Sequence, residues 1–344
     1  MFITELASNP LLLVVTLLNI GVIIVNGATD APNAIATVVS TRCMKPTPAI
    51  IIAAICNFFG LLVITLVSSA VANTIFHMVD FGGDNHAAII ALMAAMVAII
   101  VWGVAAWAFG LPTSQSHSLI AGLTGAAIAL QGGLGGINGG EWMKVIYGLV
   151  LSTFLGFGSG WILTKIIARV CRNFDRVKSD HVFRWAQIVA GAGVAFMHGA
   201  QDGQKFMGIF ILAITLATGI GQADQMVLPI WLMFFCALNM GLGTAVGGKK
   251  IIKSVGMDMV KLEKHQGFSA SFAAVVCLLI STFGGLPVST THTKTTAIMG
   301  VGAAKNKKAV KWSIAIDMVK TWVLTFPAAA FLGSVFAQLF FFVL

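Results

Sequence analysis

The chain has 344 residues and a formal net charge of +9, with 58% hydrophobic and only 10% charged residues. Soluble globular proteins carry roughly a quarter charged residues, so this composition cannot cover a water-facing surface and excludes a soluble enzyme. The five cysteines are scattered and never form a Cys-x-x-Cys pair, so neither a disulfide framework nor a zinc site is expected.

Long apolar runs recur along the chain, and a helix needs about 20 apolar residues to cross the hydrocarbon of a bilayer. Two stretches, 10–41 and 185–220, are apolar but contain polar residues and glycine near their middles. Two less hydrophobic stretches, 112–130 and 287–304, start at a Gly-Leu-Pro and are expected either to span or to re-enter. Uninterrupted runs predict helices over 48–72, 87–109, 143–164, 226–247, 268–284 and 313–342. The sequence therefore predicts an all-α polytopic membrane protein of ten elements, with no removable signal peptide at its start.

Lysine and arginine mark one side of this predicted bundle, because cytoplasmic loops are enriched in them. Four gaps, 41–47, 165–184, 249–266 and 305–311, hold 17 of the 21 basic residues, whereas 73–86, 131–140 and 221–225 hold none. If the basic gaps are cytoplasmic and each element links opposite faces, the alternation closes without conflict. The charge therefore indicates orientation in a cell membrane and not binding to nucleic acid.

Two short patterns occur twice. Asn-Gly-Ala-Thr-Asp-Ala-Pro-Asn-Ala at 26–34 aligns with 198–206, an offset of 172, and Gly-Leu-Pro-Thr-Ser-Gln-Ser-His-Ser at 110–118 aligns with 285–293, an offset of 175. These similar offsets indicate a duplication of about 170 residues. Five elements per half invert the second half relative to the first, as in many secondary transporters with interrupted helices. We expect a first repeat at 1–170, a basic cytoplasmic loop at 171–184 and an inverted repeat at 185–344.

The first motif places a carboxylate in the middle of an apolar run. Pro32 removes a backbone donor, which predicts an interrupted helix. Asp30 beside it would cost about 2.5–3.5 kcal/mol at the centre of a membrane helix, so its presence favours a functional role. Together with freed carbonyls, the side-chain oxygens of Thr29 and Asn33 would suit Na⁺, or the carboxylate would hold a proton.

The second half repeats this arrangement with changes. Asp202 matches Asp30, and Gln201 stands beside it where the first half has Thr29. Lys205 breaks the symmetry: we expect it to snorkel to a membrane face, or else to pair with Asp202 or contact an anion, in that order.

The Gly-Leu-Pro-x-Ser-x-x-His motif predicts two helix starts that bind an oxyanion. Proline is pre-organised for a first helical turn, and free backbone N–H groups there attract negative charge. The symmetric His117 and His292 are expected to be orienting hydrogen-bond partners, and Lys294 has no counterpart at Leu119. The hydroxyls that would join the N–H groups belong to Thr113, Ser114, Ser116, Ser289, Thr290 and Thr291.

The duplicated motifs resemble the PiT family of inorganic phosphate transporters, whose signature repeats Gly-Ala-Asn-Asp-x-x-Asn-Ala in each half with a Pro-x-Ser-x-x-His element. The resemblance covers nearly the whole chain and implies symport of phosphate with Na⁺ or H⁺, an inverted-repeat fold and a homodimer, with no other cofactor. It implies that phosphate is held by Ser114, Gln115, Ser116, Ser289, Thr290 and Thr291. The coupling cation would be held by Asp30, Asn33 and Asp202, with Thr29 and Gln201 where the family has Asn, and the two aspartates would bind Na⁺ if sodium drives transport. Asn26, His117, His292 and Lys205 would support the site.

The sequence thus predicts a secondary active transporter in which the two repeats rock around a midplane site. An inside-negative membrane opposes anion entry by about 2.3 kcal/mol per charge per 100 mV, so phosphate uptake needs cotransported cations. The alternatives are a sulfate or other oxyanion symporter of the same fold and, less favoured, an anion channel, for which no ring of Arg or Lys is visible. A membrane enzyme acting on phosphate esters is not expected, because no nucleophile with a base is recognisable.

Overall fold

A computed structural model describes residues 9–82, 84–109, 113–218, 228–246 and 259–343. Within these ranges the secondary structure is helical throughout, with no β-strand. Six helices are long and apolar enough to cross a membrane. The prediction of an all-α polytopic membrane protein is therefore confirmed.

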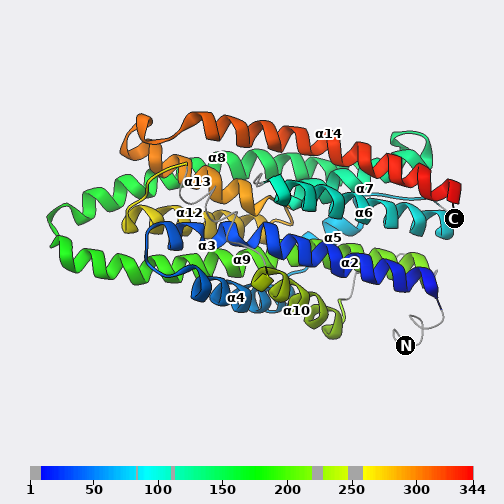
Figure 1. Ribbon diagram of the computed structural model, residues 1–344, viewed down its shortest axis with the longest axis horizontal. Helices are drawn as coiled ribbons and strands as arrows, with labels where there is room; N and C mark the ends of the chain where they lie inside the picture. Colours follow the sequence, from blue (N-terminus) through cyan, green and yellow to red (C-terminus); the bar gives the residue numbers. More distant parts are fainter. Residues whose placement is uncertain (1–8, 83, 110–112, 219–227, 247–258, 344) are drawn as a thin grey trace.

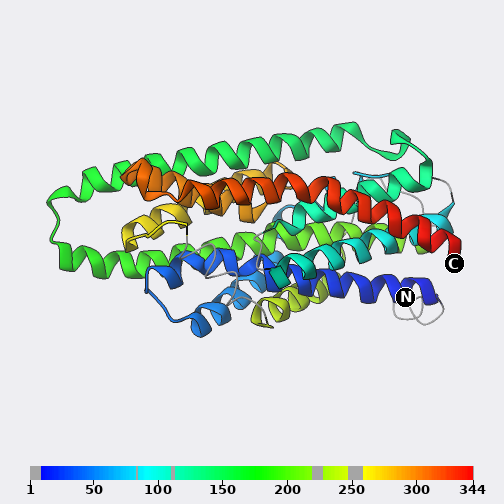
Figure 2. The same cartoon turned by 45° about the horizontal axis from the view of Figure 1, so that its top comes forward.

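In the described residues, the first half of the chain forms seven α-helices. In chain order these are α2 (Pro10–Thr29), α3 (Ala31–Ser40), α4 (Pro46–Val67), α5 (Ala70–Phe76), α6 (Asn85–Phe109), α7 (Gln115–Gln131) and α8 (Gly139–Val170). The second half forms α9 (Arg176–Thr218), α10 (Ile230–Val246), α12 (Lys264–Phe283), α13 (Thr290–Lys305) and α14 (Trp312–Val343). Figures 1 and 2 show the long helices α2, α8, α9 and α14 running along the longest axis of the molecule.

The predicted interruption at Asp30 is present. Helix α2 ends at Thr29, Asp30 is the residue between the two helices, and α3 begins at Ala31 with proline in its first turn. Pro32 has no N–H to continue the hydrogen-bond ladder of α2, which explains the position of the break.

Three sequence predictions of helix boundaries were wrong. The stretch 185–220 is not interrupted: α9 runs unbroken for 43 residues through Asp202, because 198–206 contains no proline. For the same reason the predicted loop 171–184 is mostly helix, with a 3₁₀ turn at Cys171–Asn173 and α9 starting at Arg176. The predicted helix 48–72 is broken instead, since Ser68 adopts an extended conformation between α4 and α5.

The Gly-Leu-Pro elements belong to two helical hairpins. In Figures 1 and 2, α6 and α7 lie side by side in the half of the molecule near the C-terminus, and α12 and α13 lie together in the opposite half. The first residues of α7 and α13 meet, because the rings of His117 and His292 are 4.3 Å apart. Of the two expectations for these elements, the hairpins correspond to re-entry. A re-entrant hairpin brings the chain back to the side of the membrane on which it started, and so do two successive membrane-spanning helices. The distribution of basic residues between the loops therefore cannot distinguish the two arrangements.

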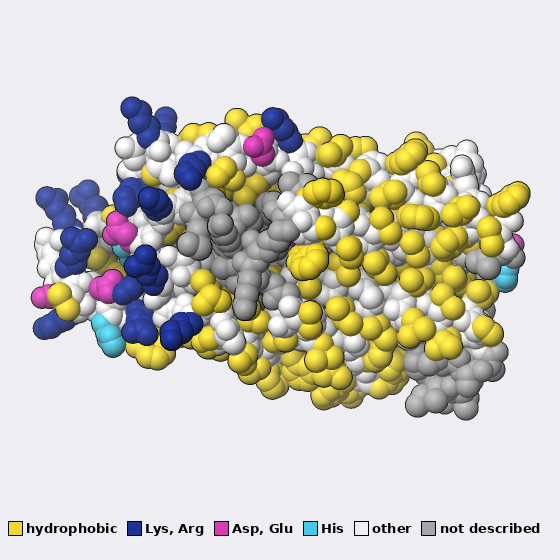
Figure 3. Space-filling model, in the orientation of Figure 1, with side chains coloured by type: hydrophobic (Ala, Val, Ile, Leu, Met, Phe, Trp, Pro, Cys, Tyr) yellow, Lys and Arg dark blue, Asp and Glu magenta, His cyan; other side chains and the backbone are white. Residues whose placement is uncertain are grey.

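The surface divides into an apolar body and a basic end. Figure 3 shows dark blue Lys and Arg side chains gathered at the end of the molecule where α3, α8 and α13 finish in Figure 1. The remaining visible surface is largely hydrophobic, and side chains such as Phe154 and Val323 are two-thirds or more exposed, as expected for contact with lipid. Lys249, Lys250 and Lys253, and the gap 221–225, lie outside the described residues.

Glycines bring helices of the two halves into backbone contact. A Cβ on Gly125 of α7 would lie 2.0 Å from the carbonyl oxygen of Ala330 in α14, and one on Gly333 of α14 would lie 2.4 Å from that of Gly122. Helices α13 and α8 meet in the same way, since a Cβ on Gly300 would lie 2.0 Å from the Phe157 carbonyl oxygen. Small residues allow such close packing of membrane helices. The second arm of each hairpin is thus packed on a long helix from the other half of the chain.

Candidate functional site

Two aspartates lie buried at the centre of the bundle, on the α2–α3 break and in the middle of α9. Asp30 is 1% exposed and Asp202 is fully buried. The two elements are in direct contact, because Asn26 of α2 donates to Oδ2 of Asp202 at 3.1 Å. The carboxylates therefore belong to one site, as the repeated motif predicted.

Asp202 is already matched by a positive charge. The ammonium of Lys205, one helical turn further along α9, lies 2.7 Å from Oδ1 of Asp202 and is fully buried. It also donates to Oγ of Ser116 and to the carbonyl oxygen of Val288, both at 2.6 Å. The expectation that Lys205 snorkels to a membrane face was wrong, because the charge is compensated within the protein.

His198 approaches the same carboxylate from the preceding turn of α9. Its Nε2 lies 3.2 Å from Oδ2 of Asp202, and its Nδ1 lies 3.1 Å from Oδ1 of Asn57. Asn57 uses its amide NH₂ to donate to Thr244, so its oxygen accepts and Nδ1 of His198 is the donor. Asp202 is thus held between two nitrogen bases of its own helix.

Asp30 has a different environment. Its Oδ2 accepts from the backbone N–H of Gln115 at 3.2 Å, and the Thr29 hydroxyl lies 3.5 Å from Oδ1. Among the described residues no Lys, Arg or His nitrogen lies within 4 Å of its carboxylate. A buried charge without a partner is costly, so this carboxylate requires a cation or a proton.

The starts of α7 and α13 face the two aspartates and are capped alike. Oγ of Ser114 accepts from the backbone N–H of His117, and Oγ of Ser289 accepts from that of His292 at 3.1 Å. Each hydroxyl accepts this bond and keeps its own proton to donate. Ser114 and Ser289 are both buried. Two helix starts with free hydroxyl donors are therefore directed into one region, which suits an oxyanion.

Polar atoms without partners gather in this region. Among the described residues these buried atoms include Oδ1 of Asn26, Oδ1 of Asn33 and Oγ1 of Thr290; the amide of Gln115 also has no partner, but it lies against Gly103 of α6. Buried polar groups are normally hydrogen-bonded, so these atoms are candidates for contact with a ligand or with water. Amide oxygens beside the Asp30 carboxylate suit a small hard cation, whereas hydroxyl and amide N–H groups suit an anion.

Some predicted residues have other contacts. Gln201 faces away from Asp202 and donates to Thr282 at 3.0 Å, and the Thr29 hydroxyl donates to the carbonyl of Val25 in its own helix at 2.8 Å. In the described part of the chain neither ring nitrogen of His292 has a partner, and its ring packs on that of Trp322; the Nδ1 of His117 also has no partner there. The start of the first Gly-Leu-Pro motif, at 110–112, lies outside the described residues.

Sequence reasoning missed two groups. His198 was passed over although it stands at the position matching Asn26 in the duplicated motif. Lys294 of α13 is fully buried and donates to Oγ of Ser271 at 2.7 Å, and Ser271 in turn contacts Thr37 of α3 at 3.1 Å. The absence of a symmetry counterpart at Leu119 was the available signal for Lys294.

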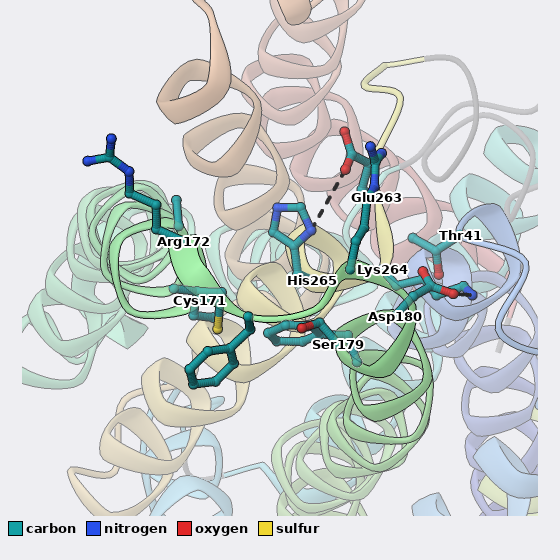
Figure 4. A pocket seen from close by; sticks show the side chains of 13 residues that line it. Thr41, Cys171, Arg172, Ser179, Asp180, Glu263, Lys264 and His265 are labelled. Carbon is teal, nitrogen blue, oxygen red and sulfur yellow. Dashed lines mark hydrogen bonds and ion pairs between the residues drawn. The ribbon is translucent and has the colours of Figure 1, made fainter.

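A polar face of α3 runs from the site to a cavity at the basic end. Asp30, Asn33, Thr37 and Thr41 are three or four residues apart, so they share one face of the helix. Thr41 lines a cavity of about 550 Å³. Figure 4 shows this cavity with Arg172, Asp180, Glu263, Lys264 and His265 around it. There Lys305 donates to Glu263 and lowers the pKa of that carboxyl.

The chain is similar to known proteins over most of its length. A model described as the phosphate transporter family matches residues 26–333. A probable low-affinity inorganic phosphate transporter of Bacillus subtilis is 39% identical over 90% of this chain and 91% of the relative, and one of Rhizobium meliloti is 36% identical over 90% of each. A solved structure described as the sodium-dependent phosphate transporter covers 98% of this chain and 100% of its own, with a TM-score of 0.89 and 22% identity. The last comparison supports the fold.

Proposed function

Because the chain belongs to the phosphate transporter family and is a transporter and not an enzyme, we propose that it takes up inorganic phosphate by symport with Na⁺ or H⁺. The observation that carries this proposal is the meeting of two capped helix starts, α7 and α13, beside two buried aspartates. The relatives named as phosphate transporters support the choice of phosphate over sulfate.

Phosphate would bind between the two helix starts. The hydroxyls of Ser114 and Ser289 keep a proton to donate, and the amide of Gln115 and the hydroxyl of Thr290 have no partner among the described residues. Ser116 and Thr291 complete the proposed set from the first turns of the same helices. Donors of this kind bind an oxyanion without a full counter-charge.

The coupling cation would bind at Asp30. The carboxylate lacks a positive partner, and Oδ1 of Asn33 and Oδ1 of Asn26 are unpartnered oxygens nearby in sequence. A cation there offsets the charge of phosphate in a site closed to water, so the binding of each ligand favours that of the other. Asp202, predicted from sequence as a second cation ligand, is already paired with Lys205.

Transport would proceed by alternating access, with release towards the basic end. The polar face of α3 and the cavity at Thr41 offer a route from Asp30 to that end. We place the basic loops in the cytoplasm of a multi-pass cell-membrane protein, in line with the positive-inside rule. The homodimer implied by the family resemblance stays a prediction.

Uptake of labelled phosphate into proteoliposomes, with Na⁺ and pH gradients imposed separately, tests the proposal. Accumulation above equilibrium under one gradient is expected. If excess sulfate inhibited the uptake of labelled phosphate as strongly as excess unlabelled phosphate does, the protein would be a general oxyanion carrier. Flux that persists with both gradients collapsed, at rates beyond those of a carrier, would indicate a channel.

A further inference from the structure

We propose that the ammonium of Lys205 is a tethered cation that takes the place of one mobile coupling cation at Asp202, so that Asp30 alone binds a cation that moves. The inference rests on the proposed function and specifies its cation stoichiometry. It starts from the duplicated motif, in which Asp30 aligns with Asp202 and Asn33 aligns with Lys205.

The structure gives Asn33 and Lys205 equivalent contacts. Asn33 donates from Nδ2 to the hydroxyl of Thr291 at 2.9 Å, in the first turn of α13. Lys205 donates from Nζ to the hydroxyl of Ser116 at 2.6 Å, in the first turn of α7. Thr291 and Ser116 are themselves matched by the repeat, with the same offset of 175 as their motifs. Lys205 therefore occupies the position that is structurally equivalent to Asn33 and places a positive charge there.

The carboxylates of Asp30 and Asp202 differ in the contacts that the residue at this position makes available. At the Asp30 end, Oδ1 of Asn33 remains without a partner, as expected of a cation ligand. At the Asp202 end, both carboxylate oxygens are occupied: Oδ1 by Lys205 and Ser116, and Oδ2 by Asn26 with His198 at 3.2 Å. The Lys205 ammonium is itself saturated by three acceptors. A mobile cation at Asp202 would find both carboxylate oxygens engaged and their charge already compensated by Lys205.

A built-in cation changes the energetics of transport. Each mobile cation adds its gradient to the driving force on phosphate, whereas a tethered one is carried by the protein and contributes nothing to accumulation. It still lowers the electrostatic cost of a nearby anion. The arrangement therefore predicts a transporter that accumulates phosphate less steeply than a symmetric two-aspartate site would allow.

The test counts cations per phosphate. In proteoliposomes at zero membrane potential, the steady-state accumulation of labelled phosphate is measured against the Na⁺ gradient at equal pH, and against the pH gradient with the same Na⁺ concentration on both sides. On logarithmic axes the two slopes are summed. For Lys205→Asn, which restores the residue found at position 33, the sum is expected to rise by one over the wild type. For Lys205→Arg, which keeps a fixed positive charge, it is expected to stay the same.

A sum for Lys205→Asn equal to that of an active wild type overturns the inference and leaves the proposed function intact. If Lys205→Asn is not recovered from membranes, the charge-neutral pair Asp202→Asn with Lys205→Asn decides: the wild-type sum is expected, and a sum lower by one would mean that Asp202 carries a mobile cation. A wild type that accumulates phosphate under neither gradient overturns the proposed function, and the inference with it.

Discussion

At the scale of single residues, the site combines one compensated carboxylate with one that lacks a partner. Asp202 has the ammonium of Lys205 at 2.7 Å, whereas Asp30 accepts from a backbone N–H at 3.2 Å. The same residue type therefore stands in two different environments, which differ in the residue three positions further along the chain. The Lys205–Asp202 ion pair lies within α9, and a buried carboxylate without such a partner favours a functional role.

Asp30→Asn is expected to abolish cation-driven phosphate accumulation, because an amide neither balances a cation nor takes up a proton. The measurement is labelled uptake in proteoliposomes, normalised to the amount of inserted protein. The control is Asp317→Asn, at an exposed pair with Lys320 on α14, which should leave uptake within about twofold. Full uptake by the Asp30 variant would contradict its assigned role.

Ser114→Ala combined with Ser289→Ala should raise the half-saturating phosphate concentration at least about tenfold. Each serine would lose one hydrogen bond to a charged ligand, about 1.5–3 kcal/mol, and tenfold in affinity corresponds to about 1.4 kcal/mol. An unchanged value would place the anion elsewhere.

Ser118→Ala with Thr293→Ala is the matched control for that pair. These hydroxyls lie one turn further along the same two helices and donate to the carbonyls of Ser114 and Ser289, at 3.2 and 2.9 Å. Because they are used within their own helices, half-saturation should change by less than about threefold.

At the scale of helices, the sequence predicted where some helices start and break, but it did not predict which distant helices contact each other. Proline 32 correctly indicated the break after Thr29, and the Gly-Leu-Pro serines correctly indicated two helix starts. Hydropathy did not reveal that α9 continues through Asp202, because a buried polar segment without proline has the same composition whether it is helical or broken. Nor did it reveal that Lys205 is buried, since that depends on Ser116 and Val288 from distant helices.

The packing of α8 on α13 gives a test with two glycines of one helix. A Cβ on Gly160 would lie 2.5 Å from the carbonyl oxygen of Ala297, whereas one on Gly158 would have no heavy atom within 4 Å. Gly160→Ala should therefore destabilise the protein by about 1–3 kcal/mol, and Gly158→Ala should not. The measurement is the apparent melting temperature in detergent, where equal values would show that the two helices separate freely.

At the scale of the whole molecule, charge and hairpins agree on which ends share a side. Cysteines introduced at Lys45 and Lys307, in a background lacking the five native cysteines, should be labelled by an impermeant reagent from the same side of the membrane. A cysteine at Asp80, in the gap without basic residues, should be labelled from the other. Opposite accessibility of positions 45 and 307 would refute the arrangement of the two halves.

The glycine crossings also determine which parts can move as units. Helix α7 packs closely on α14, and α13 packs closely on α8, so each pair joins a helix of the first half of the chain to a helix of the second half. If residues 1–170 and 185–344 moved as two rigid bodies, these glycine contacts between helices would have to break in every transport cycle. A motion that preserves these contacts must instead move units that each contain helices from both halves of the chain. If the two halves were expressed as separate polypeptides, each would therefore fold only when the other is present.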